Sequence, residues 1–383
     1  MNILYAALRN DPRDIDRSSS VDYGFYTAFL ERGHQVEVVG PFPPRLPWWE
    51  KGIKKVHDRL TGKRYLKWDF ASVWAASQAV NKAVAATRPE VVFTMFPATL
   101  AFYRGAAPAV FNTDLTFASW QANGAGFSPI ALRVLTWIEH QALTRSAQVV
   151  LHSEWSRQDV MQRHGLPAGK LNVLPMPSAL PLDAVPESID VLADKALPDP
   201  AQAAPLRLLL VGKEYHRKGI DIATEVVTML NQQGLPAELT VCASIGPPAP
   251  HVRYVGPFRK SVPAELASYM ALYRQAHLLI HPARFEPAGI VPGEAAALAT
   301  PTITNAAGAL ATTVKDGVSG IVLPKDSPAG AYVQAIRELV QEPARYYDLC
   351  ATTRRRYEEE LNWRAAGRQL DAILARAGGT IFA

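Results

Sequence analysis

The sequence has little cysteine and no long apolar stretch. Only Cys242 and Cys350 occur among its 383 residues, so neither a disulfide framework nor a cysteine-rich metal site is expected. No run approaches the roughly 18 consecutive apolar residues that a membrane-spanning helix requires. The chain starts directly with an apolar, strand-like run over residues 1–6, which lacks the features of a secretory signal. We therefore expect a cytoplasmic protein without a spanning helix.

The glycine-rich phosphate loop of nicotinamide enzymes is also missing. No Gly-x-Gly-x-x-Gly follows the apolar runs that begin at residues 2 and 206, which argues against a dehydrogenase. With 48% hydrophobic and 20% charged residues, the chain has the composition of a globular protein, and its length favours two domains. Seven prolines lie between Pro175 and Pro205. We predict domains at 1–178 and 206–359, a linker at 179–205, and a C-terminal helix at about 360–383 that packs on the first domain.

The positive charge of the chain is concentrated in one segment. Residues 41–70 hold eight Lys or Arg and three acids, and this difference (8 − 3 = 5) equals the whole net charge of +5. Apolar side chains recur there at helical steps, at Trp49, Ile53, Val56 and Leu60. Such a helix can lie on an anionic membrane, which would place the protein peripherally at the inner membrane face through residues 45–68. The alternative is an ordinary helix whose basic face borders an acceptor pocket. No nucleic-acid partner is expected, because no binding motif accompanies the charge.

Residues 278–304 predict a strand, loop, helix and strand in succession. Leu278-Leu279-Ile280 is the first strand and Thr302-Ile303-Thr304 the second. We place Pro292 at the first helical position, where its missing N–H costs nothing, and expect Pro301 to stop the helix.

Two carboxylates belong to this unit. Glu286 falls in the loop and Glu294 in the first turns of the helix. Open α/β sheets bind ligands at the carboxyl ends of their strands, and both side chains are predicted there. The backbone N–H groups of Gly289 and Ile290 would point at an anion beside the positive end of the helix.

A cationic loop is predicted at the same edge. The strand at 206–211 is followed by Gly212 and then by a run that ends at Gly219. Four side chains within six residues carry or can carry positive charge: Lys213, His216, Arg217 and Lys218. A solvated surface run is the alternative, but the position on a strand-to-helix turn favours a phosphate site.

These motifs carry a resemblance to a known family. Glu286 and Glu294, eight apart around Gly-Ile-Val, resemble the Glu-x7-Glu signature of retaining glycosyltransferases of family four (group 1). The loop at 212–219 resembles their donor loop, with Lys213 in place of the usual Arg. The resemblance implies an α/β fold of the GT-B type, with two Rossmann-like domains facing a central cleft. It further implies that Glu286 sits at the transferred sugar and Glu294 on the nucleotide ribose.

Further positions follow from the resemblance. Asp114 comes after a strand at 109–111, where one branch of the family carries Asp-x-Thr-Phe near the acceptor; it can equally cap the next helix. Phe258 lies at a turn that borders the base in the family, as a lid on the base or as a core aromatic. The implied catalytic residues are Glu286, Asp114, Lys218 and Arg217, and the implied donor-binding residues are Lys213, Arg217, Lys218, Phe258, Gly289, Ile290, Val291 and Glu294.

The sequence also departs from the family pattern. Ser19-Ser20 stands where a small or glycine pair is usual before the first helix, and Thr312 or Thr313 replaces an expected acid.

The expected activity is transfer of a hexose, with retention, from a UDP- or GDP-sugar to an acceptor hydroxyl on a glycan, a lipid-linked acceptor or a small molecule. We expect no metal and no further cofactor, because the cations and helix amides would carry the diphosphate charge. The alternative is a catalytically silent relative that binds nucleotide sugars or regulates a partner.

Overall fold

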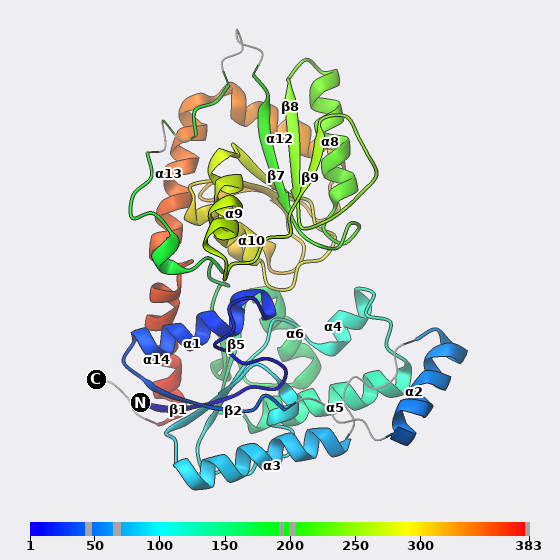
Figure 1. Ribbon diagram of the computed structural model, residues 1–383, viewed down its shortest axis with the longest axis vertical. Helices are drawn as coiled ribbons and strands as arrows, with labels where there is room; N and C mark the ends of the chain where they lie inside the picture. Colours follow the sequence, from blue (N-terminus) through cyan, green and yellow to red (C-terminus); the bar gives the residue numbers. More distant parts are fainter. Residues whose placement is uncertain (43–47, 64–69, 191–192, 194, 199–203, 380–383) are drawn as a thin grey trace. The chain divides into compact units, whose positions relative to one another are not determined.

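The computed structural model describes residues 1–42, 48–63, 70–190, 193, 195–198 and 204–379, without the side chains of 48–50. The chain forms two compact units (Figure 1). The N-terminal unit comprises Met1–Leu174 and the stretch from Gly367, and the C-terminal unit comprises Pro175–Ala366.

The N-terminal unit is built on a parallel sheet of six strands in the order β2-β1-β3-β4-β5-β6. The strands are β1 (Asn2–Ala6), β2 (Gln35–Val39), β3 (Val91–Thr94), β4 (Ala109–Asn112), β5 (Gln148–Leu151) and β6 (Leu171–Val173). Leu4 packs in a core with α3 and α5, while Tyr5 contacts Phe93, which also meets Phe25 of α1. Helices therefore cover both faces, as the continuous apolar runs of its inner strands require.

The helices of this unit are α1 (Val21–Glu31), α2 (Trp48–Thr61), α3 (Phe70–Thr87), α4 (Phe117–Ala122), α5 (Pro129–Arg145) and α6 (Glu154–His164). The chain returns to the unit within α14 (Trp363–Ala377). Asp371 of α14 accepts hydrogen bonds from Arg32 Nε at 2.6 Å and lies 2.8 Å from His34 Nε2.

The C-terminal unit has a second parallel sheet, in the order β12-β11-β10-β7-β8-β9. Its strands are β7 (Leu206–Val211), β8 (Ala237–Cys242), β9 (Val252–Val255), β10 (Leu278–His281), β11 (Thr302–Asn305) and β12 (Gly320–Leu323). This is the Rossmann order, in which the direction of winding reverses between the first and fourth strands, here β7 and β10. Ligands of such sheets bind outside the carboxyl ends at that reversal.

The helices of the C-terminal unit are α8 (Ile220–Gln232), α9 (Pro263–Gln275), α10 (Ile290–Ala297), α11 (Leu310–Thr313), α12 (Ala329–Gln341) and α13 (Pro343–Glu359). Leu208 of β7 belongs to a core with α8 and α12, and the next residue, Leu209, to a second core with α9 and α10. The prediction of an α/β fold with two Rossmann-like parts is confirmed.

The predicted start and end of α10 are wrong by a few residues. The helix begins at Ile290 rather than Pro292, because Gly289 takes a left-handed conformation (φ 75°) and serves as the N-cap. It ends at Ala297, before Pro301 is reached.

The stretch predicted as a linker packs into the C-terminal unit. Leu180 and Val185 belong to the core around β7, α9 and α10. Lys195 is fully buried, and its Nζ donates to the carbonyls of Tyr273, Arg274 and Ala276 at 2.8–3.0 Å and to Thr300 Oγ1 at 2.8 Å. A cation at the carboxyl end of α9 satisfies carbonyls that have no partner within the helix.

The basic, amphipathic helix is present as α2. Its apolar residues Ile53, Val56 and Leu60 are exposed by 47%, 58% and 80%. Trp49 and residues 45–47 and 64–68 of the predicted segment lie outside the described side chains. Among the described residues, no helix is both long and apolar enough to cross a bilayer.

Candidate functional site

Two loops meet where the C-terminal sheet reverses its winding. The loop after β7 spans 212–219 and the loop after β10 spans 282–289. Arg284 joins them: its N–H donates to the carbonyl of Arg217 at 2.9 Å, and its guanidinium binds Asp221 at 2.7 and 2.8 Å. Gly219 has φ +69°, and a Cβ there would lie 2.0 Å from the carbonyl oxygen of Pro282. Glycine is therefore required for the close approach of the two loops.

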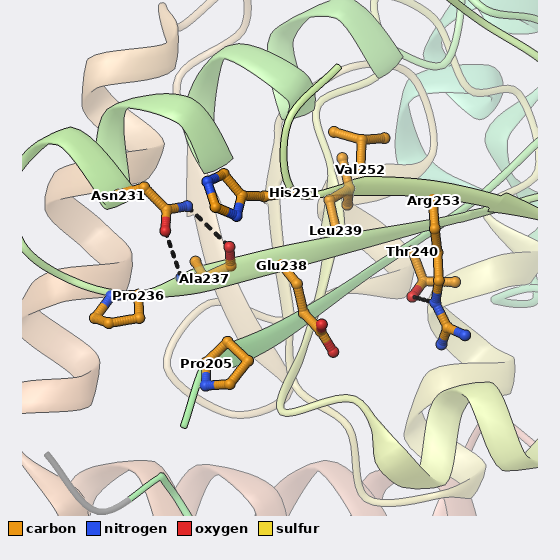
Figure 2. Close-up of a pocket in the computed structure, with 10 residues that line it drawn as sticks. All are labelled: Pro205, Asn231, Pro236, Ala237, Glu238, Leu239, Thr240, His251, Val252 and Arg253. Carbon is orange, nitrogen blue, oxygen red and sulfur yellow. Dashed lines mark hydrogen bonds between the residues drawn. The ribbon is translucent and has the colours of Figure 1, made fainter. Parts of the chain in front are cut away.

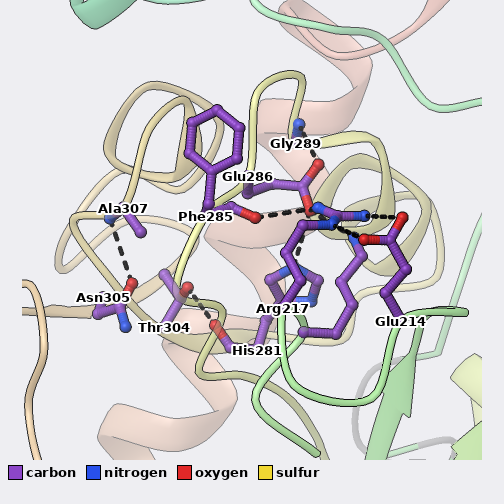
Figure 3. Close-up of polar contacts among 10 residues, drawn as sticks. Glu214, Arg217, His281, Phe285, Glu286, Gly289, Thr304, Asn305 and Ala307 are labelled. Carbon is purple, nitrogen blue, oxygen red and sulfur yellow. Dashed lines mark hydrogen bonds and ion pairs between the residues drawn. The ribbon is translucent and has the colours of Figure 1, made fainter. Parts of the chain in front are cut away.

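Two cations and one imidazole surround a single carboxylate oxygen of Glu286, Oε2 (Figure 3). Lys218 Nζ forms a short ion pair with this oxygen, Arg217 Nη1 lies 3.5 Å away, and His281 Nε2 lies 3.4 Å away. The side chains of Lys218 and Glu286 are each only 9% exposed. The sequence-predicted Arg217, Lys218 and Glu286 therefore come together in one cluster.

The electrostatics of the cluster follow from burial and charge. Burial by itself raises the pKa of Glu286, but the charge of Lys218 and the hydrogen bond from His281 bring the pKa well below its usual value. Burial, followed by the charge of Lys218, lowers the pKa of His281. Glu286 is thus a carboxylate beside a neutral imidazole at neutral pH.

The other carboxylate oxygen of Glu286 faces the start of α10. Its Oε1 accepts from the N–H of Gly289 at 3.3 Å, and the Glu286 carbonyl accepts from Ala309 N at 2.8 Å. Ile290 and Val291 follow as the first residues of the helix, and their N–H groups have no carbonyl partner within it. Such a helix start binds anions. Of the predicted amides, that of Gly289 donates to Glu286, while Ile290 and Val291 lie in the first turn of α10.

Glu294 lies in a separate polar contact. It is 1% exposed. Its Oε2 accepts from the hydroxyls of Tyr269 and Tyr273, both at 2.6 Å, and its Oε1 accepts from Lys260 Nζ at 2.7 Å. The two tyrosines stand four residues apart on α9, which puts them on one face of the helix.

The two remaining residues that were predicted to bind the donor, Phe258 and Lys213, lie in different surroundings. Phe258 is half-buried, with its ring centroid 6.2 Å from that of Tyr269, beside the Glu294 contact. Lys213 is exposed, and the described contacts of Glu286 do not include it. The loop instead brings Glu214 to Arg217, with the Glu214 Oε2 to Arg217 Nε distance at 2.6 Å.

Sequence reasoning missed His281 and Lys260. His281 directly precedes the loop that carries Glu286, so a polar residue at the end of an apolar strand was the available signal. Lys260 is 34 residues from its partner Glu294, and no local pattern connects them.

Asp114 follows β4 in the N-terminal unit, as predicted, but it does not cap the next helix. Thr116 is the N-cap of α4, accepting from Ser119 N at 3.0 Å. Asp159 of α6 accepts from Thr116 Oγ1 at 2.5 Å and from Ser119 Oγ at 2.6 Å. The first turn of α4, and with it the loop after Asp114, is therefore anchored by a carboxylate of a neighbouring helix.

Ser19 and Ser20, which replace the family's small or glycine pair, adopt glycine-like conformations, with φ of 53° and 65°. Ser18 before them has φ of 49°. L-residues adopt this region at a cost, so the departure from glycine puts strain at the start of α1.

The described residues hold no cluster of three or more His, Cys, Asp or Glu side chains that could bind a metal ion. One Asp-x-Asp occurs, Asp14-Ile15-Asp16. Its Asp14 accepts from the N–H of Asp16 at 3.0 Å and lies 3.4 Å from Arg17 Nε.

A shallow pocket of about 400 Å³ lies elsewhere on the C-terminal unit (Figure 2). It is lined by residues at the amino ends of β8 and β9, among them Glu238, Thr240 and Arg253. Arg253 Nε donates to Thr240 Oγ1 at 3.0 Å. The pocket is thus at the opposite ends of the strands from Glu286 and shares none of its residues.

Comparison with known proteins identifies the class. The profile of Glycosyltransferase Family 4 matches residues 23–177, and that of Glycosyl transferases group 1 matches residues 189–342. The chain therefore belongs to the family 4 glycosyltransferases, and its fold is GT-B.

Solved structures agree on the fold. The sucrose-phosphate synthase of Thermosynechococcus elongatus superposes with a TM-score of 0.67 at 20% identity, covering 97% of this chain and 98% of that one. HepE of Anabaena, solved in complex with UDP and glucose, superposes with a TM-score of 0.60 at 15% identity, covering 98% and 99%.

Relatives by sequence match over shorter segments. D-inositol 3-phosphate glycosyltransferase 1 of Catenulispora acidiphila is 39% identical over 101 residues, which is 26% of this chain and 20% of the relative. The glycogen synthase of Mycobacterium tuberculosis is 26% identical over 174 residues, 42% of this chain and 40% of the relative. The chain thus spans less than half the length of these relatives.

Proposed function

We propose that the protein is a retaining glycosyltransferase that moves a hexose from a nucleoside diphosphate sugar to an acceptor hydroxyl. The observation that carries the proposal is the meeting of Glu286, Lys218 and Arg217 at the start of α10. A buried and a half-buried cation beside the amides of a helix start suit a diphosphate, and a carboxylate beside them suits the hydroxyls of a sugar.

Each residue has a distinct part in this proposal. Lys218, Arg217 and the amides of Gly289, Ile290 and Val291 bind the diphosphate and stabilise the charge of the leaving group. Glu286 orients the sugar through its hydroxyls. Glu294 accepts from the ribose, and Phe258 covers the base. The exposed Lys213 of the same loop adds positive charge beside the diphosphate. In the N-terminal unit, Asp114 contacts the acceptor.

The stereochemical course follows from the family resemblance. The acceptor hydroxyl attacks from the face that the diphosphate leaves, and the departing phosphate takes the hydroxyl proton. The anomeric carbon keeps its configuration. Because the cations and helix amides can offset the charge of the diphosphate, the reaction proceeds without a metal ion.

A direct test is binding followed by turnover. Calorimetric titration with UDP, GDP and ADP, in the presence of EDTA, should show that the protein binds one of the three nucleotides clearly more tightly than the others. Incubation of the protein with the matching nucleotide hexose should then release the nucleoside diphosphate and the free sugar. If the hexose is α-linked in the donor, NMR should detect the α-anomer of the free sugar first. Binding that appears only after magnesium is added contradicts the metal-free part of the proposal.

A catalytically silent relative is the alternative function. It predicts binding of the same nucleotide with no hydrolysis of any hexose nucleotide and no transfer. Lys218 and Glu286 disfavour it, because a buried ion pair is costly to retain without use.

We also propose that α2 contacts anionic lipid at the inner membrane face. Its apolar residues Ile53, Val56 and Leu60 share one helical face and are exposed, and Lys51, Lys54, Lys55 and Arg59 are exposed on the same helix. This combination matches helices that lie in a membrane interface.

Vesicle sedimentation tests the membrane contact. Replacing Lys54, Lys55 and Arg59 with Ser should sharply reduce binding to phosphatidylglycerol vesicles, since each basic residue contributes roughly 1 kcal/mol near such a surface. Nucleotide binding should be unchanged. If the native protein does not bind these vesicles and the variant loses transfer to a soluble acceptor, the helix borders an acceptor pocket instead.

A further inference from the structure

The three groups around Oε2 of Glu286 differ in how deeply they are buried. The side chain of Arg217 is 29% exposed, that of Lys218 is 9% exposed, and that of His281 is 0% exposed. An anion that approaches from solvent can therefore reach the two cations. It cannot reach the imidazole in the same way.

The backbone holds His281 in place. It is the last residue of β10 and pairs with Thr304 of β11 in the parallel ladder. Thr304 Oγ1 also donates to the carbonyl of His281 at 2.8 Å (Figure 3). Lys218 and Arg217, in contrast, lie in the loop after β7. A ligand that moves this loop would leave the imidazole where it is.

The imidazole donates to Glu286 through its Nε2 atom. A carboxylate oxygen only accepts, so the hydrogen must lie on Nε2, and in the neutral ring Nδ1 then carries a bare lone pair. Within the described part of the chain Nδ1 has no hydrogen-bond partner, and none of those residues draws the ring away from Glu286. The distance from Nε2 to Oε2 is 3.4 Å, longer than the roughly 2.7–3.2 Å of a good hydrogen bond. This contact can shorten when the cations move away from Oε2.

Resting on the proposed function, we propose that His281 is a positioning residue, which holds Glu286 when the diphosphate of the donor binds Lys218 and Arg217. Both cations then turn from the carboxylate to the phosphate oxygens. A buried carboxylate that loses its donors is destabilised. The Nε2–H of His281 is the donor that stays. By holding Oε2 it keeps Oε1 directed at the start of α10, where the sugar hydroxyls of the donor meet it.

Calorimetric titration with UDP, GDP and ADP tests this role by a double-mutant cycle. His281→Leu should bind the preferred nucleotide about tenfold more weakly than wild type, because Glu286 is left without this donor once Lys218 is taken. In the Glu286→Gln background the same change should alter the affinity by less than about threefold, since a neutral amide does not depend on the imidazole. A histidine that only supports the fold would weaken binding equally in both backgrounds.

Amide variants separate the hydrogen bond from the fold. His281→Gln places an N–H near the position of Nε2 and should bind nearly as tightly as wild type. His281→Asn is too short to reach Glu286 and should bind as weakly as His281→Leu, so it replaces the leucine variant if that one does not fold. Turnover of the matching nucleotide hexose should follow the same order, with kcat of the Asn and Leu variants lowered about tenfold or more. His251→Asn, at an exposed histidine of the same unit, should change neither quantity.

The outcomes distinguish the two proposals. If the wild-type protein binds none of these nucleotides, the proposed function is wrong and the role of His281 with it. If it binds one of them, but the loss caused by His281→Leu is absent or is the same in both backgrounds, only the role of His281 is overturned. Binding by His281→Gln that is as weak as that of His281→Leu would overturn it too.

Discussion

Glu286→Gln should raise the affinity for the bare nucleoside diphosphate while abolishing transfer. Glu286 forms an ion pair with Lys218, the most buried cation of the cluster, and also lies near Arg217. A diphosphate must compete with this carboxylate for the same donor. Glutamine removes the competing charge, and a charge-assisted hydrogen bond contributes about 1.5–3 kcal/mol. Since the amide oxygen still accepts from Lys218, we expect the lower end, about a tenfold gain in affinity.

The same substitution should destabilise the protein. Breaking a buried ion pair outright costs about 3–5 kcal/mol, and the retained amide oxygen lowers the expected loss in unfolding free energy to about 2–3 kcal/mol. Denaturant unfolding and calorimetric titration with UDP, GDP and ADP measure both effects.

Glu214→Gln is the matched control. Glu214 also pairs with a cation of the cluster, Arg217, but its side chain is 64% exposed. Exposed pairs contribute about 0.2–1 kcal/mol, so affinity should change less than about fivefold. Equal or weaker nucleotide binding by Glu286→Gln than by wild type would refute the competition argument.

Three further predictions concern pH, loop packing and backbone strain. The pKa of Glu286 is lowered below its ordinary value of 4.5. The difference in unfolding free energy between wild type and Glu286→Gln should therefore be constant above about pH 4.5 and shrink as pH falls through the lowered pKa. Urea unfolding at several pH values measures this difference. Gly219→Ala should lower the free energy of unfolding by more than about 3 kcal/mol, since its Cβ would meet the Pro282 carbonyl. Gly234→Ala, at a position with φ +77° and open space, should lower it by only about 1 kcal/mol. Equal losses in urea unfolding would argue against the loop contact. Ser19→Gly should raise the free energy of unfolding by about 0.5 kcal/mol, seen as a slightly higher melting temperature, because glycine relieves the left-handed strain but gains freedom when unfolded. Ser19→Ala, which keeps the strain, should not.

Much of the donor-side arrangement could be predicted from the sequence. The apolar runs at 206–211 and 278–280 predicted parallel strands, and in a Rossmann-like sheet their carboxyl ends lie at one edge. Lys218 and Glu286, each placed just after such a strand, were therefore expected to meet, and they do. The start of α10 was misplaced, because the conformation of Gly289 and not the position of Pro292 determines where the helix begins.

The partners of Glu294 could not be predicted in the same way. Lys260 reaches Glu294 from a loop before α9, and Tyr269 and Tyr273 reach it from α9 itself. These contacts depend on how α9 packs against α10, which hydrophobic periodicity does not specify. Whether Asp114 caps the next helix could not be decided from the sequence, because Thr116 is also a suitable residue and only the register of the helix chooses between them.

The buried ammonium group of Lys195 limits where the chain can be truncated. A fragment beginning at residue 206, where the second run of strands starts, would lack this cation and the apolar residues Leu180 and Val185, and would expose the carboxyl end of α9. Since α9 carries both tyrosines that hold Glu294, such a fragment would be expected to bind nucleotide poorly. A fragment comprising 175–366 keeps every one of these contacts and is the appropriate piece for isotope labelling or soaking.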